Sequence, residues 1–223
     1  MFDSSPIWSG APPTLSCHAA TVADLGAGRL LAAWFGGTHE GHPDVSIWLS
    51  RYDGARWSAP AKIAAEPGVP LWNPVLFRDA AGVIWLFYKA GPNVPAWSGL
   101  YRQSRDAGHT WSDPVWLPAG LTGPVKNKPI TLSNGDILCG ASAETWRNWT
   151  AWAELSADGG RSWTRHGPIT APADIGRGDP LCRNSWGYTP GCSLTTYPFG
   201  LGGIAGWSQR WHTCGNYACY GGA

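Results

Sequence analysis

The sequence predicts an all-β protein, and three observations support that class. Charged residues make up only 14% of the 223 residues, well below the roughly 25% of an ordinary domain. Thirty glycines and 19 prolines indicate many turns between short elements, and 16 tryptophans add to an aromatic content that suits strands. The third observation is a short motif that recurs three times before residue 164.

Each repeat predicts four strands in succession. The first strands are short apolar runs, at residues 17–22, 74–77 and 129–132. The second strands are longer apolar runs that open with a glycine, at residues 28–35, 82–89 and 135–142. The third strands lead into the motif, at residues 45–49, 99–103 and 151–155, and a fourth follows each motif. Short runs bounded by glycine and rich in β-branched or aromatic residues are typical of buried strands rather than helices.

The recurring motif reads S-x-D-x-G-x-x-W. It is complete at residues 104–111 and 156–163, and a degenerate copy lies at residues 52–57. Asp and Ser side chains bond the backbone of turns, and a tryptophan fills space between strands. We therefore interpret the recurring aspartates and tryptophans as structural: Asp53, Asp106, Asp158, Trp57, Trp111 and Trp163. An interval of about 50 residues between copies is the size of a β-propeller blade.

The repeat also predicts the domain organisation. A four-stranded unit cannot bury both faces alone, so neighbouring units must stack. We expect an incomplete propeller of about three blades over residues 1–175. Residues 176–223 contain four cysteines, no lysine and a single acid, Asp179, and no further copy of the motif. We interpret them as an atypical tail, either frameshifted or a degraded fourth blade.

Composition excludes several classes of partner. The net charge is +1 and no basic patch stands out, so we expect no nucleic acid. No apolar run reaches the ~20 residues of a membrane helix. The N-terminus lacks the charged and apolar regions of a signal peptide. The chain as written therefore predicts a cytoplasmic protein, and its localisation stays open if residues precede Met1.

Four segments between the motifs carry a family resemblance: residues 16–21, 34–48, 72–76 and 123–129. They resemble the bacterial predicted-neuraminidase branch of the sialidase superfamily, in which the recurring motif is the Asp box, or BNR repeat. The resemblance extends over residues 14–170. It implies a six-bladed β-propeller with a site at its central mouth. It also implies an exo-α-sialidase activity that removes a terminal acidic sugar from a glycan partner.

In sialidases an Asp is the acid/base, a Tyr assisted by a Glu is the nucleophile, and three Arg bind the sialic acid carboxylate. This chain has no Phe-Arg-Ile-Pro motif to supply the first Arg, and no Tyr/Glu pair can be assigned. We therefore expect little or no activity from this chain alone. Two alternatives stay open: a polysaccharide lyase or other glycosidase on the same propeller, and a non-catalytic carbohydrate-binding propeller.

Polar residues at corresponding strand ends are the first candidates for substrate binding. His18, Asn73 and Lys128 lie at the entry of the first strands, while Lys89 and Glu144 end second strands. Equivalent positions in a propeller lie around one axis, so these side chains are expected at a common mouth. In the alternative, they bond neighbouring loops or water. Lys126 joins Lys89 and Lys128 in a cationic patch that could bind a sugar carboxylate as point charges.

The loop at residues 36–44 is the second candidate region. The resemblance places the acid/base in this loop, and Glu40 and Asp44 are both candidates. A general acid needs a raised pKa, which burial or a second carboxylate supplies. His39 is a candidate for substrate binding, but His39 and His42 are a weak metal signal, so we expect no metal and no cofactor. In the alternative, these residues only solvate the loop.

Overall fold

A computed structural model of the protein describes residues 5–8, 10–145 and 149–169. Over these residues the regular elements are twelve β-strands and one short 3-10 helix, η1 (Val94–Ala96). The predicted all-β class is therefore confirmed. The tail predicted at residues 176–223 lies outside the described residues, so its interpretation stays a prediction.

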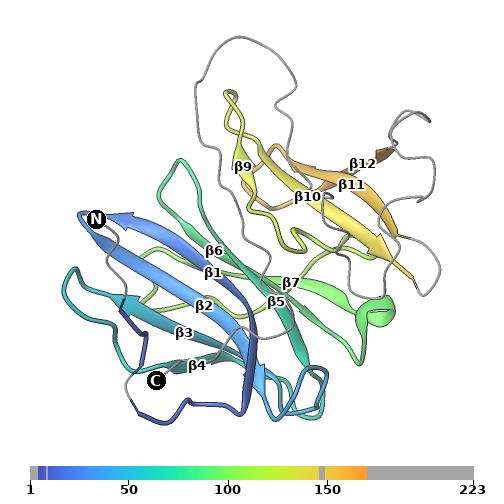
Figure 1. Ribbon diagram of the computed structural model, residues 1–223. Coiled ribbons are helices and arrows are strands. Elements are labelled where there is room, and N and C mark those ends of the chain that lie inside the picture. The colour runs from blue at the N-terminus through green and yellow to red at the C-terminus, as the bar shows by residue number, and fades with distance from the viewer. Residues whose placement is uncertain (1–4, 9, 146–148, 170–223) are drawn as a thin grey trace, which may run out of the picture. The chain divides into compact units, whose positions relative to one another are not determined.

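The strands form three antiparallel sheets of four strands each (Figure 1). The first sheet contains β1 (Ser16–Gly26), β2 (Arg29–Gly37), β3 (Ser46–Tyr52) and β4 (Ala61–Ala64). The second contains β5 (Leu71–Arg78), β6 (Ile84–Ala90), β7 (Ser98–Ser104) and β8 (Val115–Trp116). The third contains β9 (Ile130–Thr131), β10 (Ile137–Glu144), β11 (Trp149–Ser156) and β12 (Thr164–Ile169). Within each sheet the strand order follows the chain, so each repeat forms its own meander.

Two hydrophobic clusters join successive sheets. The first cluster includes Leu31 and Phe35 of β2 together with Leu86 of β6. The second includes Phe87 of β6 together with Cys139 of β10, so it lies between the second and third sheets. Each sheet thus buries a face against the next, which is how propeller blades stack. The closed ring of six blades stays a prediction, because the described residues form three sheets.

The Asp box of the second sheet is a turn held by its own side chains. Ser104 Oγ donates to Asp106 Oδ1 at 2.8 Å and accepts the Gly108 N–H at 2.8 Å. Asp106 also accepts the Thr110 N–H at 2.8 Å and the Thr110 hydroxyl at 2.6 Å. Trp111 Nε1 donates to the Gly108 carbonyl at 3.2 Å. Every polar member of the motif therefore has a partner inside the turn.

The other two boxes differ from each other. In the third sheet, Asp158 accepts the Ser162 hydroxyl at 2.6 Å, which repeats the pattern of the second sheet. In the first sheet, Asp53 instead accepts the backbone N–H groups of Ala55 at 2.8 Å and Arg56 at 2.9 Å. The degenerate box is therefore held by a different set of hydrogen bonds.

Candidate active site

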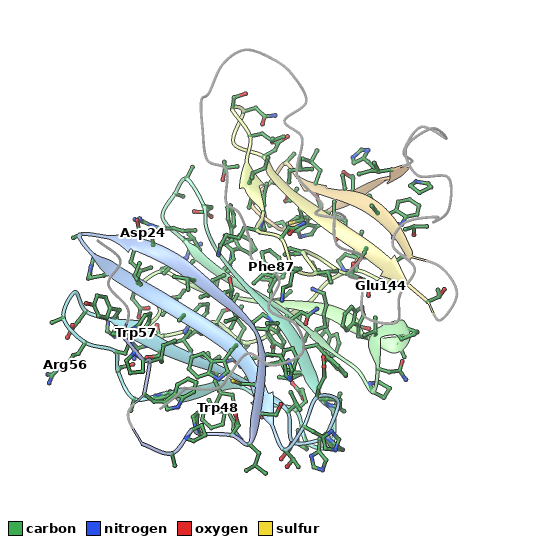
Figure 2. The ribbon with its side chains drawn as sticks, in the orientation of Figure 1. Asp24, Trp48, Arg56, Trp57, Phe87 and Glu144 are labelled. Carbon is green, nitrogen blue, oxygen red and sulfur yellow. The ribbon has the colours of Figure 1, made fainter. Side chains whose placement is uncertain are left out.

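The loops that join second to third strands lie at one end of the sheets, and the Asp boxes lie at the other. This follows from the antiparallel order, because β3 runs from the loop at residues 38–45 to the first box. Figure 2 shows Glu144 at one end of β10, and Arg56 and Trp57 of the first box at the opposite side of the view. We call the first end the mouth face, formed by residues 38–45, 91–97 and 117–129.

Asp44 closes the loop at residues 38–45. Its carboxylate accepts the Thr38 N–H at 3.0 Å and the Thr38 hydroxyl at 2.7 Å, and it lies 2.7 Å from His42 Nδ1. The hydrogen bonds from Thr38 hold the pKa of Asp44 well below its usual range, with a smaller contribution from His42. Asp44 is therefore ionised at neutral pH, and a carboxylate without a proton is a poor general acid.

Glu40 lies in the same loop, and its charge acts on a lysine from another part of the chain. The negative charge of Glu40 acts on Lys126 and raises its pKa, while the larger effect, desolvation by neighbouring atoms, lowers it. Lys126 belongs to the connection that leads to the third sheet. The fold thus brings a carboxylate within electrostatic range of an ammonium group that the sequence separates by more than 80 positions.

Aromatic side chains pack against this loop. A Cβ at Gly41 would lie 3.2 Å from Cη2 of Trp72, so the loop backbone rests on the indole. Trp72 Nε1 donates to the Gly91 carbonyl at 2.8 Å, and its ring packs against that of Trp97 with centroids 6.1 Å apart. The His39 ring contacts that of His42 at a centroid distance of 5.0 Å. Trp72 and Trp97 therefore link the loop to η1 of the second sheet.

The ammonium groups of two of the predicted binding lysines donate to oxygens of the protein. Lys89 is completely buried and its Nζ donates to the Pro124 carbonyl at 2.9 Å. Burial lowers the pKa of Lys89 to about 8, and the nearby Glu154 opposes that shift. Lys128 Nζ donates to Thr21 Oγ1 at 3.1 Å and to the carbonyls of Val22 at 2.5 Å and Leu76 at 2.8 Å. Both ammonium groups are thus engaged with the protein, and their predicted role in binding substrate stays a prediction.

His18 and Asn73 lie where the first strands are irregular. The pairing of β1 with β2 is interrupted between His18 and Thr21, and that of β5 with β6 between Trp72 and Val75. Each interruption contains a residue with positive φ, Ala19 at 52° and Asn73 at 42°. These bulges align Asn73 with Ala19 rather than with His18. The positive φ at this position explains the asparagine, since Asn adopts the left-handed conformation more readily than most residues.

Glu144 lies in a separate cavity between the second and third sheets. The cavity has a volume of about 270 Å³, and its lining includes Trp97, Thr122, Glu144 and Arg165. The Ser142 hydroxyl donates to the Glu144 carboxylate. Burial raises the pKa of Glu144, against the effect of the Ser142 hydrogen bond.

Sequence reasoning missed Arg165 and Trp97, because neither lies at the end of a first or second strand. The Arg165 guanidinium stacks on Trp152 at 3.9 Å and donates from Nη1 to the Gly120 carbonyl at 2.8 Å. No pattern in the sequence marks either residue as part of a cavity. No group of three potential metal-ligating residues occurs in the described part of the chain. Among the same residues, no helix is long and apolar enough to cross a membrane.

Stacked four-stranded sheets with Asp boxes at one end and polar loops at the other define a protein of the Asp-box class. The family model described as the BNR repeat-like domain matches residues 28–185, and the chain belongs to that family. This match, together with the solved structures below, confirms the resemblance to the sialidase superfamily. A search of curated proteins gave no match.

Solved structures share the fold at low sequence identity. The Hadza microbial sialidase Hz136 aligns with a TM-score of 0.59 and 17% identity, over 70% of this chain and 38% of that chain. A protein of unknown function from Dyadobacter fermentans aligns with a TM-score of 0.57 and 17% identity, over 70% and 56%. The Trypanosoma rangeli sialidase in complex with sialic acid aligns with a TM-score of 0.52 and 14% identity, over 68% and 30%. The chain thus spans between 30% and 56% of the length of these structures.

Proposed function

We propose that the mouth face binds a terminal acidic sugar of a glycan, as in a sialidase-type exo-glycosidase, and that this chain alone has little or no turnover. The observation that carries the proposal is the placement of Glu40 and Lys126: both lie in loops at the same end of the fold, and the negative charge of Glu40 acts on Lys126. The family match and the sialidases among the structural neighbours support this choice of substrate class.

Lys126 is the group we assign to the sugar carboxylate. It is exposed on the mouth face, whereas the ammonium groups of Lys89 and Lys128 already donate to protein oxygens. A lysine binds a carboxylate as a point charge, without the two-pronged geometry of arginine. His39, which lies in the same loop as Glu40, is a further candidate for contact with the sugar.

Glu40 is the group we assign to proton donation. It lies within the loop that the family resemblance identifies, and its charge acts on Lys126, where the sugar would bind. Asp44 is the weaker candidate because three hydrogen bonds from Thr38 and His42 hold it in its ionised form. A general acid must carry a proton and release it to the departing oxygen of the glycosidic bond.

Binding and turnover are tested separately on the purified 223-residue chain. Saturation-transfer NMR measures binding of N-acetylneuraminic acid, and a fluorogenic sialoside measures turnover. Removal of one charge-assisted hydrogen bond costs about 1.5–3 kcal/mol, so Lys126→Gln is expected to weaken binding by at least about tenfold. Lys62→Gln is the matched control, because Lys62 lies on the edge strand β4, over Trp48.

The outcomes separate the proposal from its alternatives. Glu40→Gln is expected to leave sugar binding nearly intact and to abolish any turnover of the fluorogenic substrate. Formation of an unsaturated product, seen as ultraviolet absorbance, would assign the site to a lyase. Saturable binding without turnover in any longer relative would indicate a binding propeller. Failure of the wild-type chain to bind any acidic monosaccharide overturns the proposal.

A further inference from the structure

A second cavity lies at the opposite end of the first sheet from the mouth face. Its volume is about 370 Å³, and it is bounded by the first Asp box, the β1–β2 turn and the second Asp box. The lining residues are Leu25, Arg29, Arg51, Tyr52, Asp53, Arg56, Trp57, Ser58, Ala107 and His109. Three guanidinium groups and one carboxylate therefore surround it.

The degenerate first box supplies the unusual members of this lining. Where the complete boxes carry Asp106 and Asp158, the first box carries Tyr52. Where they carry Thr110 and Ser162, whose hydroxyls bond those aspartates at 2.6 Å, it carries Arg56. Both residues of the structural pair have thus been replaced by residues that line the cavity.

The contacts within the cavity leave Arg29 and Arg56 available to a ligand. Asp53 accepts two backbone N–H groups of its own turn, which keep its pKa below the usual range. Asp53 Oδ2 lies 3.9 Å from Arg56 Nε, and both side chains are exposed, so the ion pair between them is weak. Arg51 is anchored through Nη1 to the Gly108 carbonyl at 2.6 Å. Arg29 makes a single long bond, 3.4 Å from Nε to the Gly26 carbonyl.

Two aromatic rings form a wall beside these cations. Tyr52 and Trp57 pair across the turn as an isolated β-bridge, and their ring centroids lie 5.2 Å apart. The equivalent Trp111 and Trp163 pack against the hydrophobic clusters between sheets, and their Nε1 atoms bond the box carbonyls. Trp57 is half-buried and lines the open cavity instead. Aromatic faces suit the apolar face of a sugar ring.

We propose that this cavity binds an anionic saccharide. A sulfate or uronate group contacts Arg29 and Arg56, and a sugar ring lies against Tyr52 and Trp57. Arginine is suited to such planar or multi-oxygen anions because its donors form a fixed fork. The cavity is separated from the mouth face by the length of β3, about 20 Å of strand. The inference therefore does not rest on the proposed sialidase-type activity.

Isothermal titration of the whole chain with a chondroitin sulfate tetrasaccharide tests the proposal. Arg29→Gln and Arg56→Gln are each expected to weaken binding about tenfold, since each removes one charged contact. Arg105→Gln is the matched control, because Arg105 is an exposed arginine in the second box that does not line the cavity. All three side chains are exposed, and thermal melts verify that the variants stay folded.

Three results overturn the proposal. The first is no binding of the tetrasaccharide, and the second is equal weakening by Arg105→Gln, which would indicate nonspecific attraction. The third is binding of inorganic sulfate as tight as that of the tetrasaccharide, which would define a simple anion site. Trp57→Leu separates the ring contact from the charge contact, because it is expected to weaken tetrasaccharide binding but not sulfate binding. Sialic acid binding at Lys126 is expected to be unchanged in all of these variants, so the two proposals fail independently.

Discussion

Replacing Gly160 with alanine is expected to destabilise the junction between the second and third sheets. Gly160 has φ +88°, and a Cβ at this position would lie 2.2 Å from Cη2 of Trp85. Trp85 has little room to move, because it is 1% exposed, stacks on Phe87 at 5.6 Å and donates to Asp79 at 2.9 Å. The added methyl group must therefore displace the indole or the box turn.

The magnitude follows from two costs and one gain. A left-handed conformation costs a residue other than glycine about 1–2 kcal/mol. Overpacking a well-filled core adds about 1–3 kcal/mol. The smaller conformational freedom of alanine in the unfolded chain offsets about 0.4–1 kcal/mol. The free energy of unfolding is thus expected to fall by about 1–5 kcal/mol, out of the roughly 5–15 kcal/mol of a typical domain.

Urea unfolding followed by tryptophan fluorescence measures this loss of stability. Alanine variants of two other Asp-box glycines provide the comparison. Gly159 has φ +71° and no atom within 4 Å of a Cβ, so Gly159→Ala carries the conformational cost alone. Gly108 has φ +81° and a Leu31 methyl group at 3.0 Å, so Gly108→Ala is expected to fall between the two. Equal urea midpoints for the Gly159 and Gly160 variants would refute the packing argument.

Three further predictions concern titratable groups. Hydrogen bonds from Ser162 lower the pKa of Asp158 from 3.8 to about 2. The stabilisation that Asp158 gives to the folded state is therefore present above pH 4 and lost as pH falls toward 2. Asp158→Asn is expected to flatten the decline of the urea midpoint in that range. Burial lowers the pKa of Lys128 from 10.5 to about 8, so the unfolded chain binds more protons between these values and stability rises with pH there. Lys128→Met is expected to reduce that rise, and an unchanged slope would contradict the assignment. Asp44→Asn is expected to lower the melting temperature and Glu40→Gln to leave it nearly unchanged; equal losses would refute the structural role given to Asp44.

The strands could be predicted from the sequence because their signals are local. Each depends on an apolar run, a glycine turn and a box at fixed spacing, and each repeat confirms the others. The shortest strands are the hardest to predict, because β8 and β9 contain only two residues each. Their length depends on pairing with a neighbouring strand, and no local sequence pattern predicts that pairing.

The candidate site was harder to predict, because a strand-end position does not determine where a side chain points. Lys89 and Lys126 are both cationic residues near strand ends, yet one is fully buried and the other is exposed. The structure aligns Asn73 with Ala19, one residue away from the predicted alignment with His18, and a shift of one residue reverses the face of a strand. The proximity of Glu40 to Lys126 depends on how two sheets pack, which the sequence repeat does not encode.

Within the described residues, packing distinguishes the complete boxes from the degenerate one. Gly108 of the second box meets Leu31 of the first sheet, and Gly160 of the third box meets Trp85 of the second sheet. Each complete box therefore fits a turn against the sheet before it. A Cβ at Gly54 of the first box would meet only the Gly28 carbonyl, at 4.0 Å, among the residues that the structure describes. The two positions that changed character, Tyr52 and Arg56, are the ones that line the cationic cavity.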